Sequence, residues 1–371
     1  MTVEFNTLNR LCSRYKDDYK QAINRVIDSA HFILGKELDA FEERFASFCG
    51  AKYCVGLNSG LDALTLSLRA LGIGCGDDVI VSANTYIASV IAITQNRAKP
   101  VFVEPDVYYC IDADRIESAI TPHTKAIMPV HLYGQTCNME VICKIAKQYN
   151  LLVVEDCAQS HSAQTNGRMT GAFGAAGCFS FYPTKNLGAF GDAGAVVTDD
   201  ETIADKLRMM RNYGSKNKYY NEIEGVNSRM DELQAAVLST QLSHIAELTE
   251  ERIRIADRYI NGITNEHIIL PKKRAGASNV YHLFVVRSVK RDALRQYLLS
   301  NGVKTQIHYP IPPHLADCYK HLGYANGSFP VTEQYASEML SLPLFYGMTE
   351  DETDYVIDAL NRFSIKDDTT L

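Results

Sequence analysis

The chain has 371 residues, 46% of them apolar and 22% charged, which is enough to bury the cores of a large domain and a smaller one. Its formal net charge of −7 gives no general attraction to nucleic acid, so an anionic ligand would need a local site. The ten cysteines form no C-x-x-C pair, which predicts reduced thiols in a cytoplasmic protein. No run reaches the ~18 apolar residues of a membrane span, and the N-terminus carries charges where a signal peptide is apolar. We therefore expect a cytoplasmic protein with neither nucleic acid nor a membrane as partner.

Short apolar, β-branched runs recur between residues 53 and 199. They read YCVGL, DVIVSA, PVFVE, AIMPVHL, LLVVEDC, CFSFYP and AGAVVTD. Most are separated by segments with helical spacing, such as Leu64, Leu68 and Leu71. This alternation predicts an α/β fold with a mostly parallel, seven-stranded sheet flanked by helices.

The pattern changes after residue 230 to long helical stretches, followed by a mixed region in which Val285 and Val286 suggest a strand. We therefore expect a large domain over residues 1–245 and a smaller α+β domain over residues 246–371. Open parallel sheets bind ligands at the carboxyl ends of their strands, so polar residues that directly follow the apolar runs are the candidates for a site.

The first candidate follows YCVGL, where Asn58, Ser59 and Gly60 open a helix and Asp62 completes a capping-box spacing. An N-cap is the simplest interpretation. The same geometry offers free backbone N–H groups and the positive end of a helix dipole, which can hold a phosphate. Tyr86, after the next run, could lie flat against an aromatic ligand or pack in the core.

Two later segments are more specific. VVEDCAQ leads a buried strand into Asp156 and Gln159, where a buried carboxylate needs a cationic partner. FSFYPTKNLGAFGDAGA places Ser180 and Lys185 after a further strand, between Pro183 and a glycine-rich stretch whose small residues let the backbone approach a ligand. A lysine in a crowded apolar cleft has a lowered pKa and can act as nucleophile and base.

Other patterns do not indicate chemistry. GIGCGD at 72–77 leads from a helix into a strand, the reverse of the dinucleotide-binding order, and is predicted to be a turn. The histidines His123, His131, His308 and His314 show no metal-ligand spacing, so we expect no metal.

Taken together, the motifs NSGLDAL, VVEDCAQSH, SFYPTKNLGAFGDAGA, NSRMDELQAA and QIHYPIPPH resemble, in the same order, those of the DegT/StrS family of nucleotide-sugar aminotransferases. The resemblance covers almost the whole chain and implies the fold type I architecture of pyridoxal phosphate (PLP) enzymes. Ser162 stands where relatives often carry glycine, and LPLFYGMT lacks their usual Pro-Glu.

The resemblance also implies roles for single residues. Lys185 would form the Schiff base with PLP and shuttle the proton, while Asp156 would pair with the ring nitrogen. The remaining cofactor contacts would be Gln159 at the phenolic edge, Tyr86 on the ring, Ser59, Gly60 and Ser180 at the phosphate, and Asn227 reaching the cofactor of the neighbouring subunit. Shared sites of this kind imply a homodimer.

For the substrate, the resemblance implies that His308 and Tyr309 contact a sugar nucleotide, with Tyr182, Tyr309 and Arg252 as candidates for its diphosphate. The segment LGAFGDAG and Gln159 resemble enzymes that aminate C-3, so the expected reaction converts a dTDP-3-keto-6-deoxyhexose, galacto or gluco, with L-glutamate as donor. Three alternatives stay open: amination at C-4, a PLP sugar dehydratase, and a non-catalytic regulator with this fold. Lys185 and Asp156 argue against the last two.

Overall fold

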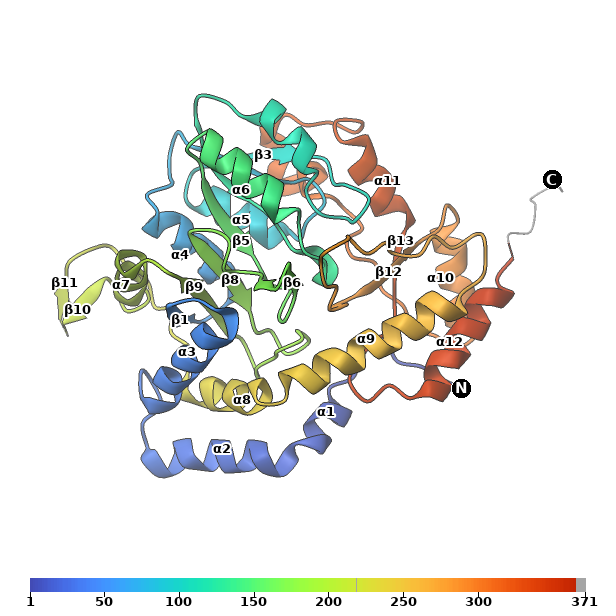
Figure 1. Ribbon diagram of the computed structural model, residues 1–371, viewed down its shortest axis with the longest axis horizontal. Helices are drawn as coiled ribbons and strands as arrows, with labels where there is room; N and C mark the ends of the chain where they lie inside the picture. The colour runs from blue at the N-terminus through green and yellow to red at the C-terminus, as the bar shows by residue number, and fades with distance from the viewer. Residues whose placement is uncertain (218, 365–371) are drawn as a thin grey trace.

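The computed structural model describes residues 1–217 and 219–364 and is built around one large sheet (Figure 1). The sheet has seven strands in the order β1-β9-β8-β5-β4-β2-β3. Their bounds are β1 Tyr53–Leu57, β2 Asp78–Ser82, β3 Lys99–Val103, β4 Thr124–Met128, β5 Leu152–Asp156, β8 Ala176–Ser180 and β9 Gly194–Thr198. Each overlaps one of the seven apolar runs, so the predicted strands are confirmed.

Pairing in the sheet is parallel for β2–β3, β2–β4, β4–β5 and β5–β8, and β9 runs antiparallel to both of its neighbours, β1 and β8. The mostly parallel sheet is therefore confirmed. An antiparallel neighbour needs no crossover helix. Residues 181–193 can thus connect β8 to β9 directly at the carboxyl end of β8, and this connection carries Lys185.

Helices cover both faces of the sheet because successive strand residues point to opposite sides. In β2, Val79 and Val81 belong to the core shared with Leu64 of α4, whereas Ile80 belongs to the core shared with Ile142 of α6. The first seven helices are α1 Asn9–Arg14, α2 Lys16–Ser29, α3 Lys36–Cys49, α4 Gly60–Ala70, α5 Ile87–Gln95, α6 Met139–Gln148 and α7 Glu201–Met210. The GIGCGD segment is a turn between α4 and β2, as predicted.

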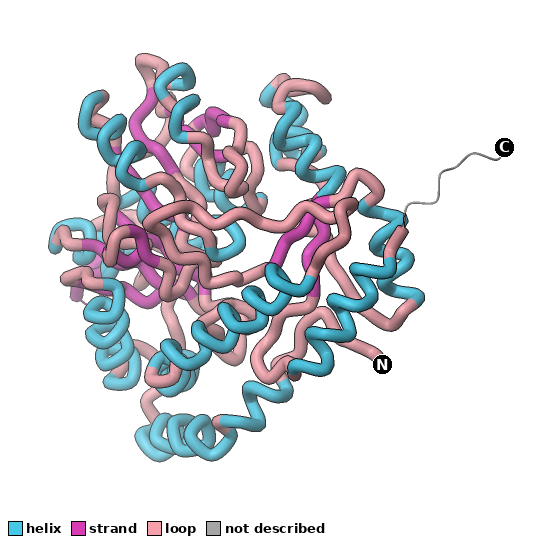
Figure 2. The backbone as a smooth tube through the Cα atoms, turned by 45° about the vertical axis from the view of Figure 1, so that its right-hand side comes forward, coloured by secondary structure: helices cyan, strands magenta, loops and turns pink. Residues whose placement is uncertain are grey.

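The C-terminal part is arranged around the antiparallel pair β12 (Phe284–Arg287) and β13 (Met339–Leu342), which confirms the strand expected at Val285 and Val286. Figures 1 and 2 show this pair beside α9, α10 and α12, away from the large sheet. The later helices are α8 Glu232–Leu242, α9 Ile245–Gly262, α10 Arg291–Ser300, α11 Pro330–Glu338 and α12 Glu350–Arg362. Four two- or three-residue strands form separate hairpins, β6 Gln164–Thr165 with β7 Arg168–Met169 and β10 Ser215–Asn217 with β11 Tyr220–Asn221.

The division into 1–245 and 246–371 stays a prediction, and residues 365–371 lie outside the described residues. Its boundary falls at the start of α9, but packing crosses it in both directions. Val3, from the N-terminus, belongs to the C-terminal core, and Tyr335 of α11 belongs to the core of the large sheet.

All ten cysteines have free thiols. In the part of the chain that the structure describes, no helix combines the length and the apolar character needed to cross a membrane.

Candidate active site

One cavity opens where β5 and β8 end, and its wall continues into the C-terminal part through His308 and Tyr309. Ten of the twelve residues singled out from the sequence line it. They are Ser59, Gly60, Tyr86, Asp156, Gln159, Ser180, Tyr182, Lys185, His308 and Tyr309. Segments up to 250 residues apart in the sequence therefore meet at one site.

Asp156 is the last residue of β5 and is almost fully buried at the cavity wall. Its Oδ2 accepts a hydrogen bond from Ser89 Oγ at 2.7 Å, and its Oδ1 accepts one from the Ala158 N–H at 3.1 Å. Burial raises the pKa of this carboxyl above its usual value, and the Ser89 hydrogen bond acts in the opposite direction. A cation placed against Asp156 would favour the ionised carboxylate.

Lys185 lies across the same cavity in the connection between β8 and β9, and its backbone N–H donates to Tyr182 O at 2.8 Å. Its amine has no hydrogen-bond or ion-pair partner among the described residues. Burial lowers the pKa of this amine to about 8, although Asp156 acts to raise it. Near neutral pH a sizeable fraction of the amine is therefore unprotonated, as a nucleophile or base requires.

The end of the cavity formed by Ser59, Gly60 and Ser180 is the candidate phosphate site. Ser59 is the N-cap of α4, and its Oγ accepts from Asp62 N at 3.1 Å, so the predicted cap is confirmed. The segments approach closely: a Cβ on Gly60 would lie 2.5 Å from Ser180 Cβ, and a Cβ on Gly194 would lie 2.2 Å from Ser59 O. Only glycines fit here, and the first N–H groups of α4 are free of intrahelical partners, as a phosphate cradle requires.

The aromatic wall consists of Tyr86 and Tyr309, whose ring centroids lie 5.1 Å apart. Gln159 is fixed behind it, because its Oε1 accepts from Tyr133 N at 2.7 Å and its Nε2 donates to Tyr309 Oη at 3.0 Å. These bonds set the orientation of the amide toward the cavity. Tyr86 is half exposed, so its ring has a free face.

His308 and Tyr182 complete the predicted substrate contacts. His308 Nδ1 lies 2.8 Å from Ser341 Oγ, and burial lowers its pKa to about 4, with the charge of Lys185 acting in the same direction. The imidazole is therefore neutral at physiological pH and can exchange hydrogen bonds with hydroxyl groups. Tyr182 is about half exposed at the cavity mouth.

Arg252 does not join this cavity, and its expected contact with a diphosphate needs correcting. The guanidinium is buried in α9, where Nε donates to Tyr281 O at 3.0 Å and Nη2 donates to the carbonyls of His282 and Leu344 at 2.7 and 3.3 Å. These carbonyls belong to the C-terminal part of the chain. Arg252 thus ties α9 to that part instead of facing a ligand.

Asn227 also lies outside the cavity of its own chain and is exposed. Its backbone pairs with Asn212, and the neighbouring Ser228 donates to Asp62 Oδ2 at 2.7 Å, close to the N-terminus of α4. A role toward a second subunit is compatible with this position and stays a prediction.

The structure adds residues that the sequence did not single out. Ser89 holds the Asp156 carboxylate, His282 lines the cavity and pairs through Nδ1 with Asn186 Oδ1 at 3.2 Å, and Phe5 and Asn6 bring the N-terminus to the cavity wall. Ser89 lies one helical turn after Tyr86, which is the only local signal that could have revealed it.

A buried group of His131, Glu155 and Cys157 has ligand atoms within 4.8 Å of one another. The atoms of two of these residues are already engaged: Glu155 Oε2 is 3.0 Å from His131 Nε2, Glu155 Oε1 accepts from Phe173 N at 2.7 Å, and His131 Nδ1 accepts from Cys137 N at 3.1 Å. Hydrogen bonds of this kind are what buried polar groups such as His131 and Glu155 require, and the absence of a metal stays a prediction.

Residues 13–361 match the model of the DegT/DnrJ/EryC1/StrS aminotransferase family. A dTDP-3-amino-3,6-dideoxy-alpha-D-galactopyranose transaminase of Aneurinibacillus thermoaerophilus is 52% identical over 97% of this chain and 99% of its own length.

Solved structures of aminotransferases share the fold of this chain over almost its whole length. DesV of S. venezuelae, in complex with a ketimine intermediate, superposes with a TM-score of 0.95 at 45% identity over 97% of this chain and 98% of its own. NtdA of Bacillus subtilis, with bound cofactor PMP, superposes with a TM-score of 0.90 at 33% identity over 97% of this chain and 84% of its own. The resemblance noted in the sequence and the expected fold class are therefore confirmed.

Proposed function

Because this chain belongs to the DegT/DnrJ/EryC1/StrS aminotransferase family, an enzyme family dependent on PLP, we propose that it transfers an amino group from L-glutamate to C-3 of a dTDP-3-keto-6-deoxyhexose. The product would be a dTDP-3-amino-3,6-dideoxyhexose of galacto or gluco configuration. The observation that carries the proposal is the meeting of Lys185 and Asp156 in one cavity with His308 and Tyr309.

The cavity fits PLP on its own geometry. The glycine-lined cradle at Ser59, Gly60 and Ser180 would hold the phosphate, Tyr86 would lie against the ring, and Gln159 would face its phenolic edge. Bound PLP supplies an electron sink that stabilises negative charge at the carbon losing a proton. Asp156 would keep the ring nitrogen protonated, because a buried carboxylate favours a cationic partner.

Lys185 is the residue suited to move the proton. Its amine has no competing partner among the described residues, and its lowered pKa lets it accept and release a proton near neutral pH. L-Glutamate would leave as 2-oxoglutarate before the keto-sugar enters, so we expect ping-pong kinetics.

Amination at C-3 is supported by the dTDP-3-amino-3,6-dideoxy-alpha-D-galactopyranose transaminase of Aneurinibacillus thermoaerophilus, which is 52% identical over nearly the full length of both chains. Tyr182, His308 and Tyr309 are the proposed sugar contacts, since they line the cavity together with Lys185. Amination at C-4 is the second candidate. The presence of both Lys185 and Asp156 in the cavity disfavours a dehydratase and a non-catalytic regulator.

The deciding experiment supplies the purified PLP enzyme and L-glutamate with 3-keto and 4-keto dTDP-6-deoxyhexoses in parallel. We expect the amino sugar only from the 3-keto compounds. Amination of the 4-keto compound alone would refute the C-3 assignment and leave the aminotransferase assignment intact. Loss of the cofactor's visible absorption band on adding L-glutamate tests the donor separately.

We further propose a homodimer with shared sites and a cytoplasmic location. The exposed position of Asn227, outside the cavity of its own chain, supports the shared site, and the ten free thiols support a reducing compartment.

A further inference from the structure

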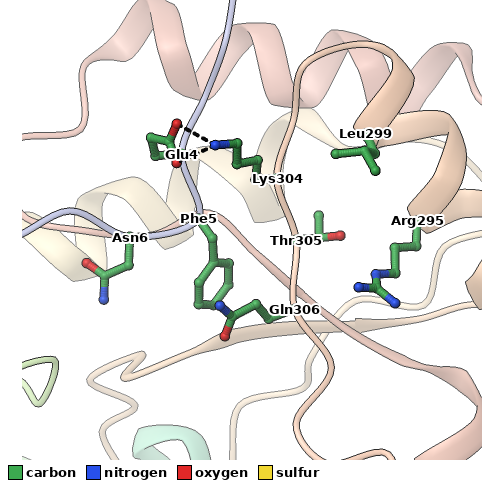
Figure 3. Close-up of a pocket in the computed structure, with 8 residues that line it drawn as sticks. All are labelled: Glu4, Phe5, Asn6, Arg295, Leu299, Lys304, Thr305 and Gln306. Carbon is green, nitrogen blue, oxygen red and sulfur yellow. Dashed lines mark hydrogen bonds and ion pairs between the residues drawn. The ribbon is translucent and has the colours of Figure 1, made fainter.

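A second cavity adjoins the proposed active site. It is lined by Glu4, Phe5, Asn6, Arg295, Leu299, Lys304, Thr305 and Gln306 (Figure 3). Phe5, Asn6 and Gln306 line the active-site cavity as well, so the two spaces share a wall. A ligand with one end at Lys185 could therefore extend into the second cavity.

The second cavity is formed by three separate segments that hydrogen bonds hold together. Val3 N donates to Gly302 O at 2.9 Å, and Lys304 N donates to Val3 O at 3.0 Å, which fixes the N-terminal segment along residues 302–304. Val3 is fully buried in the C-terminal core. The walls are thus set before a ligand arrives, which reduces the entropy cost of binding.

Two positively charged side chains line this cavity, and only one of them is already paired with a carboxylate. Lys304 Nζ pairs with both carboxylate oxygens of Glu4, at 2.8 and 3.0 Å. Arg295, on α10, is exposed and has no ion-pair or hydrogen-bond partner among the described residues. Figure 3 shows its guanidinium on the side of the 304–306 segment that faces away from the Glu4–Lys304 pair.

The proposed substrate needs such a cation. Within the described lining of the active-site cavity, Lys185 is the sole lysine or arginine, and it is committed to the chemistry. Arg252 is turned to backbone carbonyls. The net charge of −7 gives no general attraction for a diphosphate, so a cation close to this cavity would favour binding of the diphosphate attached to the sugar.

We propose that this second cavity binds the nucleoside diphosphate end of the sugar-nucleotide substrate, with Arg295 paired to the phosphates. The inference rests on the proposed function. An arginine guanidinium offers paired donors that match phosphate oxygens. The side-chain amides of Asn6 and Gln306 have no partner among the described residues and can both donate to and accept from the edge of a pyrimidine base.

The length of the segment 304–308 is compatible with a ligand that extends from the proposed sugar site into the second cavity. Three residues separate His308, at the proposed sugar site, from Lys304, and extended backbone spans about 13 Å over these four residue steps. Gln306 pairs with Ser341 in an extended β-bridge midway along it. The segment thus leads from the sugar contact past the amide of Gln306 to the cation-bearing cavity.

The test compares Arg295→Gln with Arg254→Gln in the PLP-loaded enzyme. Arg254 is a matched control, since it is an exposed arginine on α9 that lines neither cavity. The Kd of dTDP and of thymidine would be measured calorimetrically at low salt. We expect Arg295→Gln to weaken dTDP binding about tenfold, as the loss of a charge-assisted hydrogen bond predicts, and to leave thymidine binding within about twofold.

Arg295→Lys should restore most of the dTDP affinity, and Arg254→Gln should bind dTDP like the unaltered enzyme. Equal dTDP affinity in Arg295→Gln and Arg254→Gln would overturn the proposal. Reaction with L-glutamate alone distinguishes this failure from that of the proposed function, because glutamate has no nucleotide. If L-glutamate converts the cofactor in every variant, the aminotransferase assignment stands whatever dTDP does.

Discussion

At the scale of single residues, Lys185 is the group on which the proposed chemistry depends most. It faces a cavity and has no partner among the described residues, so Lys185→Ala removes little packing. We expect the variant to fold and unfold like the parent but to lose at least about 10³-fold in turnover, because nucleophile and base disappear together. Thermal unfolding and steady-state assays measure the two effects. Lys147→Ala, at an exposed site on α6, is the control, and retained turnover in Lys185→Ala would refute the assignment.

The lowered pKa of Lys185 predicts a pH dependence for the apoenzyme. Burial lowers this pKa from 10.5 to about 8, so the neutral, reactive fraction of the amine is about a tenth at pH 7 and rises to about nine-tenths at pH 9. Covalent attachment of added PLP should therefore speed up as the pH rises and level off above about pH 9. The rate is followed by the cofactor's absorbance. A rate that still climbs steeply between pH 9.5 and 10.5 would show that the amine behaves like an exposed lysine.

The sequence predicts which residues reach the site directly after a strand. It does not predict the residues that hydrogen-bond to them or pack beside them. Asp156, Ser180 and Lys185 each stand directly after an apolar run, so their position at the carboxyl edge follows from local pattern. Ser89 and His282 reach the site only through tertiary packing. For Arg252 the sequence predicts a ligand contact that is wrong, because its guanidinium donates to backbone carbonyls, which a helical pattern does not reveal.

At the scale of elements, the apolar runs predicted all seven strands because both faces of this sheet are covered by helices. The sequence does not predict that β9 runs antiparallel to its neighbours, because an apolar run carries no information on the direction of a strand. That direction matters for the site. β8 ends and β9 begins at the same edge, so Gly194 lies against Ser59, and a Cβ at this position would meet Ser59 O at 2.2 Å.

Gly194→Ala should therefore displace the N-terminus of α4 and the candidate phosphate cradle. We expect it to destabilise the fold by about 1–3 kcal/mol, as overpacking against backbone does, and to weaken PLP binding about tenfold. Gly191→Ala is the matched control, because its Cβ would meet only the end of the Gln234 side chain, at 3.1 Å. Thermal unfolding with and without PLP and PLP titration of the apoenzyme give the two quantities. Equal behaviour of the two variants would mean that the close approach is not needed.

For the whole molecule, exposed apolar side chains lie near Asn227, the residue for which we propose a contact with a second subunit. Tyr213 is 52% exposed and its N–H donates to Val226 O, beside Asn227. Ile33 and Phe32 are also exposed, and Ile33 pairs with Asp231 on the other side. Exposed large apolar residues gathered near one segment are typical of a protein interface. The proposed homodimer would bury them.

The shared site can be tested by mixing subunits. If each site takes Lys185 from one chain and Asn227 from the other, a dimer of one Lys185→Ala and one Asn227→Ala subunit contains one intact site and one doubly altered site. Random mixing makes half of the dimers mixed, so about a quarter of all sites should regain full activity. Activity after unfolding and refolding the mixture measures this. A mixture of Lys185→Ala with the Lys185→Ala/Asn227→Ala double variant is the control and should stay inactive. If the first mixture shows no more than the residual activity of its Asn227→Ala subunits, each site is built within a single chain, and the exposed position of Asn227 needs another explanation.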